Sequence, residues 1–262
     1  MKRNIYFCLL SLTILSFFLS LNLLGDESHS PSSLEFLDMV RRNHPVDTWA
    51  MMSGEVSHKR RNDDNNSIIK RTSVETTPIK LSTRFTETRV FTKITIGKKG
   101  KEESDTVGEE GKEEFYTVGQ AYNGDAPSVI TSVLPEVSKL GKYGLKPEDL
   151  TMAFIYWKFE KELDKTTLKT MDCRVFLLSN PETTEQVKVY ITADYYYPMK
   201  AEWFESEKKK SYKTYYINSF TKIDKLWAPN SFYLCGPGWR TNVEFDKVNL
   251  GFVKDGLPKG LF

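Results

Sequence analysis

The chain has 262 residues, of which 39% are hydrophobic, 13% aromatic and 27% charged, a composition typical of a folded protein with a sizeable apolar core. Lys2 and Arg3 are the only charged residues before Asp26, so the 37 basic residues of the whole chain fall to 35 in the rest, equal to the 35 acidic ones. A body without net charge lacks the basic surface that offsets phosphate charge, which excludes nucleic acid as a partner.

The N-terminus has the layout of a secretory signal peptide. Lys2 and Arg3 precede an uncharged apolar stretch, residues 5–24, and the small residue Gly25 leads into a polar segment. We predict cleavage near Gly25 and export of a single domain, residues 26–262, to the periplasm or cell envelope of a bacterium. The apolar stretch is also about as long as a membrane span, so an uncleaved anchor over residues 1–25 remains an alternative.

A short amphipathic helix is predicted near the start of the exported body. Leu34, Leu37 and Val40 recur at helical spacing, and Ser33 has the side chain of a helix N-cap. The helix is expected over residues 34–43. Because it is short and apolar on one face, it needs a surface to pack on.

Alternation of apolar and polar residues with a period of two predicts antiparallel strands over most of the chain that follows. Gly54 predicts a bulge or bend in the first of them. Gly97–Gly111 is rich in Lys, Glu and Gly and has Val107 as its only apolar anchor, so we expect an exposed, mobile and dispensable loop. The strands expected in this half are residues 48–58, 67–76, 79–85, 89–96 and 115–118.

A second short helix is predicted in the middle of the chain, over Glu148–Tyr156. Pro147 suits the first turn of a helix, and two acidic residues follow it there. Leu150, Phe154 and Trp157 share one face of this helix. A short segment with so much aromatic surface has to lie against the sheet.

The most regular stretch is Val187–Pro229, which predicts four consecutive antiparallel strands joined by short turns. A hairpin over Leu163–Leu178 precedes this meander, and a strand over Trp239–Leu250 follows it. The expected fold is mainly β, with about ten or eleven strands in one domain. The two short helices, near residues 34–43 and 147–157, are expected to pack on the same concave side.

The sequence contains none of the arrangements that carry catalysis or hold a cofactor. The three histidines, His29, His44 and His58, have no partners at metal-ligand spacing, and no nucleophile motif or phosphate-binding glycine loop is present. We therefore expect neither an enzyme nor a metal or cofactor site. Cys173 and Cys235 remain after removal of the signal, either as a disulfide, which export permits, or as two buried thiols.

Four short stretches then carry a family resemblance. They are Asp149–Trp157 (DLTMAFIYW), Met171–Leu178 (MDCRVFLL), Val187–Asp194 (VKVYITAD) and Phe220–Pro229 (FTKIDKLWAP). In their order, after a signal peptide and a short helix, they resemble the LolA-like periplasmic lipoprotein carriers, the outer membrane lipoprotein-sorting proteins. The resemblance covers roughly the last hundred residues, and the first half matches in layout.

The resemblance implies a half-open antiparallel β-barrel whose helices form a lid on its concave side. It implies a monomeric, non-catalytic carrier or binder of lipidated protein or lipid acyl chains, with membrane-bound donor and acceptor proteins as partners. An alternative is a sensory or structural module of the cell envelope with the same fold, a filled interior and a protein partner. The residues that the resemblance assigns to the lipid-binding cavity are Phe154 and Trp157 from the lid and Val189, Ile191, Met199 and Trp203 from the sheet.

We further expect these two sets to face each other across an apolar gap without buried charge, because an acyl chain offers no polar partner. The alternative is that the same side chains interdigitate as an ordinary core.

Overall fold

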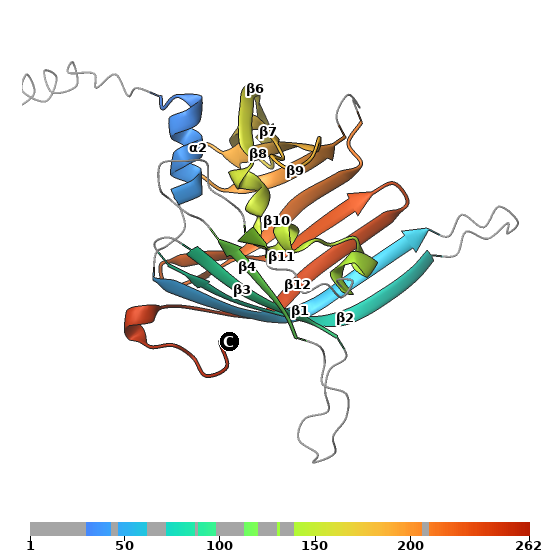
Figure 1. Ribbon diagram of the computed structural model, residues 1–262, viewed down its shortest axis with the longest axis vertical. Coiled ribbons are helices and arrows are strands. Elements are labelled where there is room, and N and C mark those ends of the chain that lie inside the picture. Colours follow the sequence, from blue (N-terminus) through green and yellow to red (C-terminus); the bar gives the residue numbers. More distant parts are fainter. Residues whose placement is uncertain are drawn as a thin grey trace, which may run out of the picture.

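The computed structural model describes residues 30–42, 47–61, 72–86, 89–97, 113–119, 130–131, 139–205 and 210–262. They form one strongly curved antiparallel sheet with short helices gathered on its concave side (Figure 1). The predictions for residues 1–25 and for the loop beyond Gly97 fall outside the described residues. Among the described helices, none is long and apolar enough to span a membrane.

The strands of the sheet follow the chain closely. They are β1 (Thr48–Arg61), β2 (Thr72–Phe85), β3 (Arg89–Ile96), β4 (Glu113–Gly119), β5 (Ile130–Thr131), β6 (Lys158–Leu168), β7 (Met171–Ser179), β8 (Gln186–Thr192), β9 (Pro198–Phe204), β10 (Lys213–Ile223), β11 (Leu226–Gly236) and β12 (Trp239–Phe252). The helices are α2 (Ser33–Arg42) and α3 (Pro147–Thr151), with the 3₁₀ turns η1 (Lys139–Tyr143), η2 (Ala153–Tyr156) and η3 (Val253–Asp255).

The described strands pair in the order β5-β4-β3-β2-β1-β12-β11-β10-β9-β8-β7-β6. Within β1–β5 and within β6–β12, strands that are neighbours in sequence are neighbours in the sheet. The pairing of β1 with β12 joins these two halves of the chain. The edge strands β5 and β6 stay unpaired with each other in this order, so the sheet is half open, as predicted. It has twelve strands in the described part rather than ten or eleven, since the two-residue β5 lies where the sequence shows no alternation.

Gly54 produces the bend that the sequence predicts in the first strand. The register of β1 against β12 shifts between Ser53 and Gly54. A Cβ atom at Gly54 would lie 1.8 Å from the carbonyl oxygen of Glu244, so only glycine permits this approach of the two backbones.

Two predicted elements differ in their ends for identifiable reasons. The segments 67–76 and 79–85 belong to one strand, β2, whose described part begins at Thr72. Pro78 does not interrupt this strand, although proline has no N–H to donate. Its carbonyl accepts the Gly97 N–H just past the end of β3, so the side on which Pro78 lacks a donor is the side where β3 ends. The hairpin expected from Leu163 begins earlier, at Lys158. The sequence does not predict this start, because β6 is a largely exposed edge strand whose polar residues hide the alternation.

The two predicted helices form, with local corrections. Ser32 rather than Ser33 caps α2: its hydroxyl accepts the Glu35 N–H at 3.4 Å, and the Glu35 carboxylate accepts the Ser32 N–H at 2.9 Å, a capping box. Leu34 is exposed, and the buried face of α2 begins at Phe36. The second helix is broken at Met152, whose left-handed φ of 54° separates α3 from η2.

The concave side of the sheet holds the hydrophobic core. Buried side chains of α2, η1, α3 and η2 join those of the central strands in one cluster, so both predicted helices lie on the same side of the sheet, as expected. In Figure 1, α2 stands beside β6–β9, and the helical segments of residues 139–157 lie within the curve of the sheet.

Candidate functional site

The candidate site is the interface between the concave face and the segments that cover it. We call α2 together with residues 139–157, which contain η1, α3 and η2, the lid. The six residues that the family resemblance assigns to the cavity all lie at this interface or close to it, and all are buried. Five of them belong to the central hydrophobic cluster, whereas Met199 is buried outside it.

The centre of the interface is filled by aromatic rings. Phe154 of η2 meets Trp203 of β9 edge-on, with ring centroids 5.0 Å apart, and lies 6.1 Å from Tyr215 of β10. Tyr215 in turn contacts Phe232 of β11 at 5.2 Å. The lid and sheet residues therefore face each other as expected, but they are in contact, and no gap separates Phe154 from Trp203.

A buried ion pair crosses the interface beside these rings, which corrects the expectation of a site without buried charge. The Lys213 ammonium lies 2.8 Å from Asp149 Oδ1, and the two side chains are only 6% and 1% exposed. The same ammonium lies 4.0 Å from the centre of the Trp203 ring, in a cation–π contact. Asp149 also accepts the Lys146 N–H at 2.8 Å, which caps α3. The sequence did carry a signal, because Lys213 falls in phase with the buried Tyr215.

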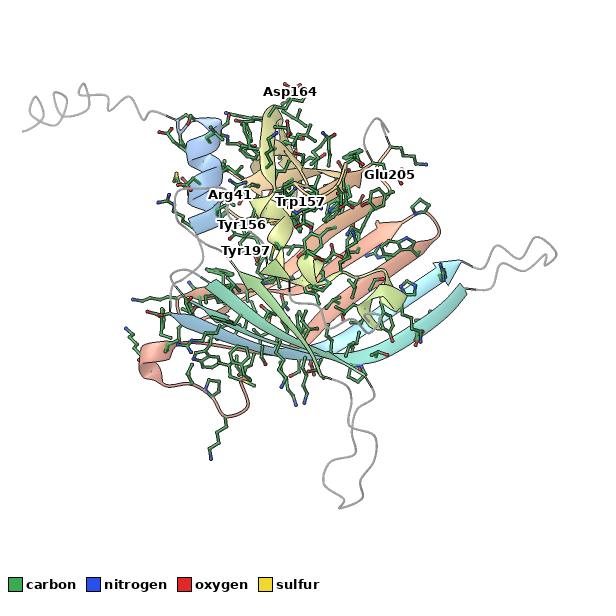
Figure 2. The ribbon with its side chains drawn as sticks, viewed as in Figure 1. Arg41, Tyr156, Trp157, Asp164, Tyr197 and Glu205 are labelled. Atoms are coloured by element: carbon green, nitrogen blue, oxygen red, sulfur yellow. The ribbon has the colours of Figure 1, made fainter. Side chains whose placement is uncertain are left out.

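The two parts of the lid are joined by Arg41. Its guanidinium donates to the carbonyl oxygens of Ile155 at 3.0 Å and Trp157 at 2.7 Å. In return, the Tyr156 hydroxyl donates to the Arg41 carbonyl oxygen at 3.1 Å. Figure 2 shows Arg41, Tyr156 and Trp157 together where α2 meets the η2 segment. We call these contacts the latch.

The start of α2 is tied to the sheet edge by a second arginine. Arg174 of β7 donates to both oxygens of Glu162 on β6, at 2.7 and 2.6 Å, and to the Pro31 carbonyl at 2.8 Å. Its guanidinium lies 4.4 Å from the centre of the Phe36 ring, so charge and packing act together. The Arg174 guanidinium lowers the pKa of Glu162, and a hydrogen bond from Ser33 adds to this effect.

The other end of the lid is anchored by Tyr143 of η1. Its hydroxyl lies 2.7 Å from the Thr77 hydroxyl of β2, and its carbonyl accepts a hydrogen bond from Thr241 of β12. Thr241 also lies 2.8 Å from Nδ1 of His58, whose pKa is lowered mainly by burial. His58, which has no partner at metal-ligand spacing in the sequence, thus contacts the lid through Thr241.

A cleft of about 390 Å³ opens at the rim, between the segment before α2 and the β6–β7 hairpin. Phe36, Arg174 and Tyr196 are among the residues that line it, together with polar groups of the hairpin. None of the six predicted cavity residues lines this cleft, but Phe36 belongs to the same buried cluster as Phe154 and Trp203.

The remaining chemistry is sparse. Within the ranges that the structure describes, no three His, Cys, Asp or Glu side chains are grouped so as to hold a metal ion. Cys173 and Cys235 are free thiols rather than a disulfide, and burial raises the pKa of both. Such thiols behave as small apolar groups rather than nucleophiles.

Two solved structures share this architecture. A DUF1329 family protein from Desulfovibrio piger is 13% identical, with a TM-score of 0.58 over 87% of this chain and 94% of its own. An outer membrane lipoprotein-sorting protein domain from Vibrio parahaemolyticus is 12% identical, with a TM-score of 0.53 over 86% of this chain and 94% of its own. No family model matches the sequence, and no curated protein does. At these identities the likeness establishes the fold, an open antiparallel sheet with a helical lid.

Proposed function

We propose that this protein binds the acyl chain of a lipid or lipidated protein between its lid and the concave face of its sheet, and carries it within the cell envelope. The observation that supports this most is the division of the concave side into a continuous apolar sheet and a separate, jointed lid. An ordinary core needs no such division, whereas a protein that admits and releases a chain does.

The middle of the lid consists of short segments joined at residues with a left-handed backbone conformation, which supports a lid that moves. Its middle segment consists of two short pieces, α3 and η2, which meet at the left-handed residue Met152. Another left-handed residue, Gly144, follows η1. Rotation at such joints moves a segment without breaking a long helix. The latch at Arg41 and the ion pair at Asp149 are among the polar contacts that this motion has to release.

An acyl chain can compensate for the burial that the Phe154 ring loses when the lid opens. Phe154 contributes one fully buried ring against Trp203 and Tyr215. Each methylene moved from water into an apolar site contributes about 0.8 kcal/mol, so a chain of a dozen carbons outweighs the burial of one phenyl ring. The rim cleft beside Phe36 and Arg174 is the opening through which we expect the chain to enter.

The comparison with the Vibrio parahaemolyticus domain supports this proposal, because that domain is described as an outer membrane lipoprotein-sorting protein. Sorting requires binding without chemical conversion. We accordingly assign this protein no catalytic step, and we place it as a monomer in the periplasm, with lipidated protein or lipid as its cargo and membrane-bound proteins as donor and acceptor.

The test combines detection of native cargo with a defined ligand. Native mass spectrometry of the protein purified from its own envelope should show bound acyl species. A fluorescent fatty acid should bind the purified protein, and Arg41→Met, which breaks the latch, should speed association. Arg42→Met is the matched control, because Arg42 lies on the same helix and pairs with Asp38 at the exposed surface. An apo mass together with no binding by either variant would overturn the proposal.

The alternative is an envelope module whose filled interior never opens and whose ligand is a protein. The direct contact of Phe154 with Trp203 favours this second function. Time-resolved fatty-acid binding separates the two, since a permanently closed module shows no binding even when the latch is removed.

A further inference from the structure

Lys213 occupies an unusual position for a charged residue in this sheet. It lies directly opposite Trp203 in the β9–β10 register, on the buried concave face, and two residues before the buried Tyr215. Its side chain is 6% exposed. An ammonium group so far removed from water requires an anion beside it, because an unpaired buried charge strongly destabilises a fold.

The anion that pairs with Lys213 comes from the lid and not from the sheet. Asp149 of α3 supplies it at 2.8 Å. The same lid segment supplies Phe154, whose ring packs edge-on against Trp203. Another acid at this end of the sheet, Glu185, lies 3.7 Å from Lys146 and accepts a hydrogen bond from Tyr212. In the closed state the lid therefore places the Asp149 carboxylate against Lys213 and the Phe154 ring against the neighbouring Trp203 of the concave face.

Opening the lid removes both groups at once. Trp203 loses its apolar cover, and Lys213 loses its counter-ion while it is still set among apolar neighbours. A ligand with a neutral head covers Trp203 again but leaves Lys213 without a counter-ion. A single-chain lipid with an anionic head restores both, because its carboxylate or phosphate pairs with Lys213 while its chain covers Trp203.

We propose that Lys213 is the headgroup site for an acyl ligand with an anionic end, and that Asp149 and Phe154 occupy in the closed state the places of its head and chain. This inference rests on the proposed function and adds the ligand class to it. It makes Asp149 a competitor of the ligand, so release of cargo is coupled to return of the lid carboxylate to Lys213.

The test uses ligands that differ only in their head: laurate, dodecyl phosphate, dodecanol and dodecyltrimethylammonium, titrated calorimetrically against the full exported chain. The wild-type protein should bind laurate or dodecyl phosphate at least tenfold more tightly than dodecanol, which corresponds to about 1.4 kcal/mol. The cation should bind more weakly than dodecanol. The ratio of laurate to dodecyl phosphate affinity identifies whether a carboxylate or a phosphate is preferred.

Three variants locate this preference. Lys213→Met should remove it and leave dodecanol binding in place. Asp149→Asn should increase affinity for laurate, because the competing carboxylate is gone. Lys222→Met is the matched control: Lys222 lies on the same strand with its ammonium 5.4 Å from the centre of the Trp227 ring, but Trp227 is 60% exposed. Because Lys213→Met leaves Asp149 buried without its cation, the double variant Asp149→Asn/Lys213→Met provides a neutral version of the same site.

Equal affinity of the wild-type protein for laurate and dodecanol would overturn the headgroup site and leave the acyl-chain proposal intact. An anion preference that persists in the double variant would also overturn it, since the preference would then arise elsewhere. Failure of the wild-type protein and of Arg41→Met to bind any of the four ligands would overturn the acyl-chain proposal, and the headgroup site with it.

Discussion

The sheet and the lid of this protein are held by different kinds of interaction. The twelve described strands form one continuous antiparallel sheet, in which stability is spread over many backbone hydrogen bonds. The lid is attached by apolar packing and by a few side chains, chiefly Arg41, Asp149 and Tyr143. Distributed contacts resist local opening, whereas contacts concentrated in a few side chains allow one part to separate while the rest stays folded.

The contact between lid and sheet should be most sensitive at Trp203. It is 2% exposed and packs against Phe154, so Trp203→Ala should lower the free energy of unfolding by about 3–5 kcal/mol in urea titrations. Added laurate should raise the thermal stability of this variant more than that of the wild-type protein, because the chain fills the new cavity. Trp227→Ala, at an exposed site, should change stability little. A stability loss at Trp203 no larger than that at Trp227 would contradict the closed packing.

Breaking the latch should affect the lid more than the sheet. Arg41→Met removes charge-assisted hydrogen bonds to two carbonyl groups, with an expected local cost of roughly 1.5–3 kcal/mol. Hydrogen exchange should become faster at the amides of α2 and at Ile155 and Trp157, while exchange in β8–β11 stays slow. Arg42→Met should leave these rates close to the wild type. Uniform acceleration across the sheet would show that lid and sheet do not open separately.

Gly54 offers the opposite perturbation, in the sheet and away from the latch. Gly54→Ala places a methyl group against the Glu244 backbone and should lower the free energy of unfolding by roughly 1–3 kcal/mol. The hydrogen-exchange rate of the Ile155 amide in the lid should increase no more than this loss of global stability accounts for. Gly97→Ala is the matched control, since a Cβ there meets open space. Equal stability of the two variants would mean that β1 and β12 approach each other less closely.

The smallest effect is expected at the sheet edge under the start of α2. Arg174 lowers the folded pKa of Glu162, so the pair stabilises the protein above the ordinary glutamate pKa and loses its contribution as the pH falls through the lower folded value. Glu162→Gln should reduce stability near neutral pH, on the order of 1 kcal/mol or less, and the difference should vanish once the pH falls below the lowered folded pKa of Glu162. Glu160→Gln, at an exposed pair with Lys158, serves as the control in thermal melts across this pH range. A difference that grows toward acid pH would contradict this assignment.

The sequence predicts the sheet better than the lid for a physical reason. Period-two alternation is a local property, so Val187–Pro229 correctly gives the meander, and Gly54 correctly gives a bend. Strand ends are less well predicted. The start of β6 at Lys158 is not predicted, because an exposed edge strand has no apolar face and therefore shows no alternation. The broken helix at Met152 also depends on packing against the sheet, which no local pattern encodes.

The candidate site shows the same limit. The sequence places Phe154 and Trp203 on facing surfaces, and the structure brings them into contact. It does not indicate that Lys213 and Asp149, 64 positions apart, form a buried pair, because pairing across such a separation depends on the tertiary fold. Arg41, whose position in the last turn of the helix suggests only a favourable dipole interaction, instead holds the latch.

Photolabelling tests most directly whether a ligand lies between lid and sheet. A laurate with a diazirine at its methyl end, bound to the wild-type protein and activated by light, should label concave residues such as Ile191 or Trp203, located by peptide mass spectrometry. Excess unlabelled laurate should suppress this labelling. In the Arg41→Met variant, labelling of the concave residues should develop faster after the ligand is added. Label confined to exposed positions such as Tyr195 or Trp227, with none on the concave face, would contradict a binding site under the lid.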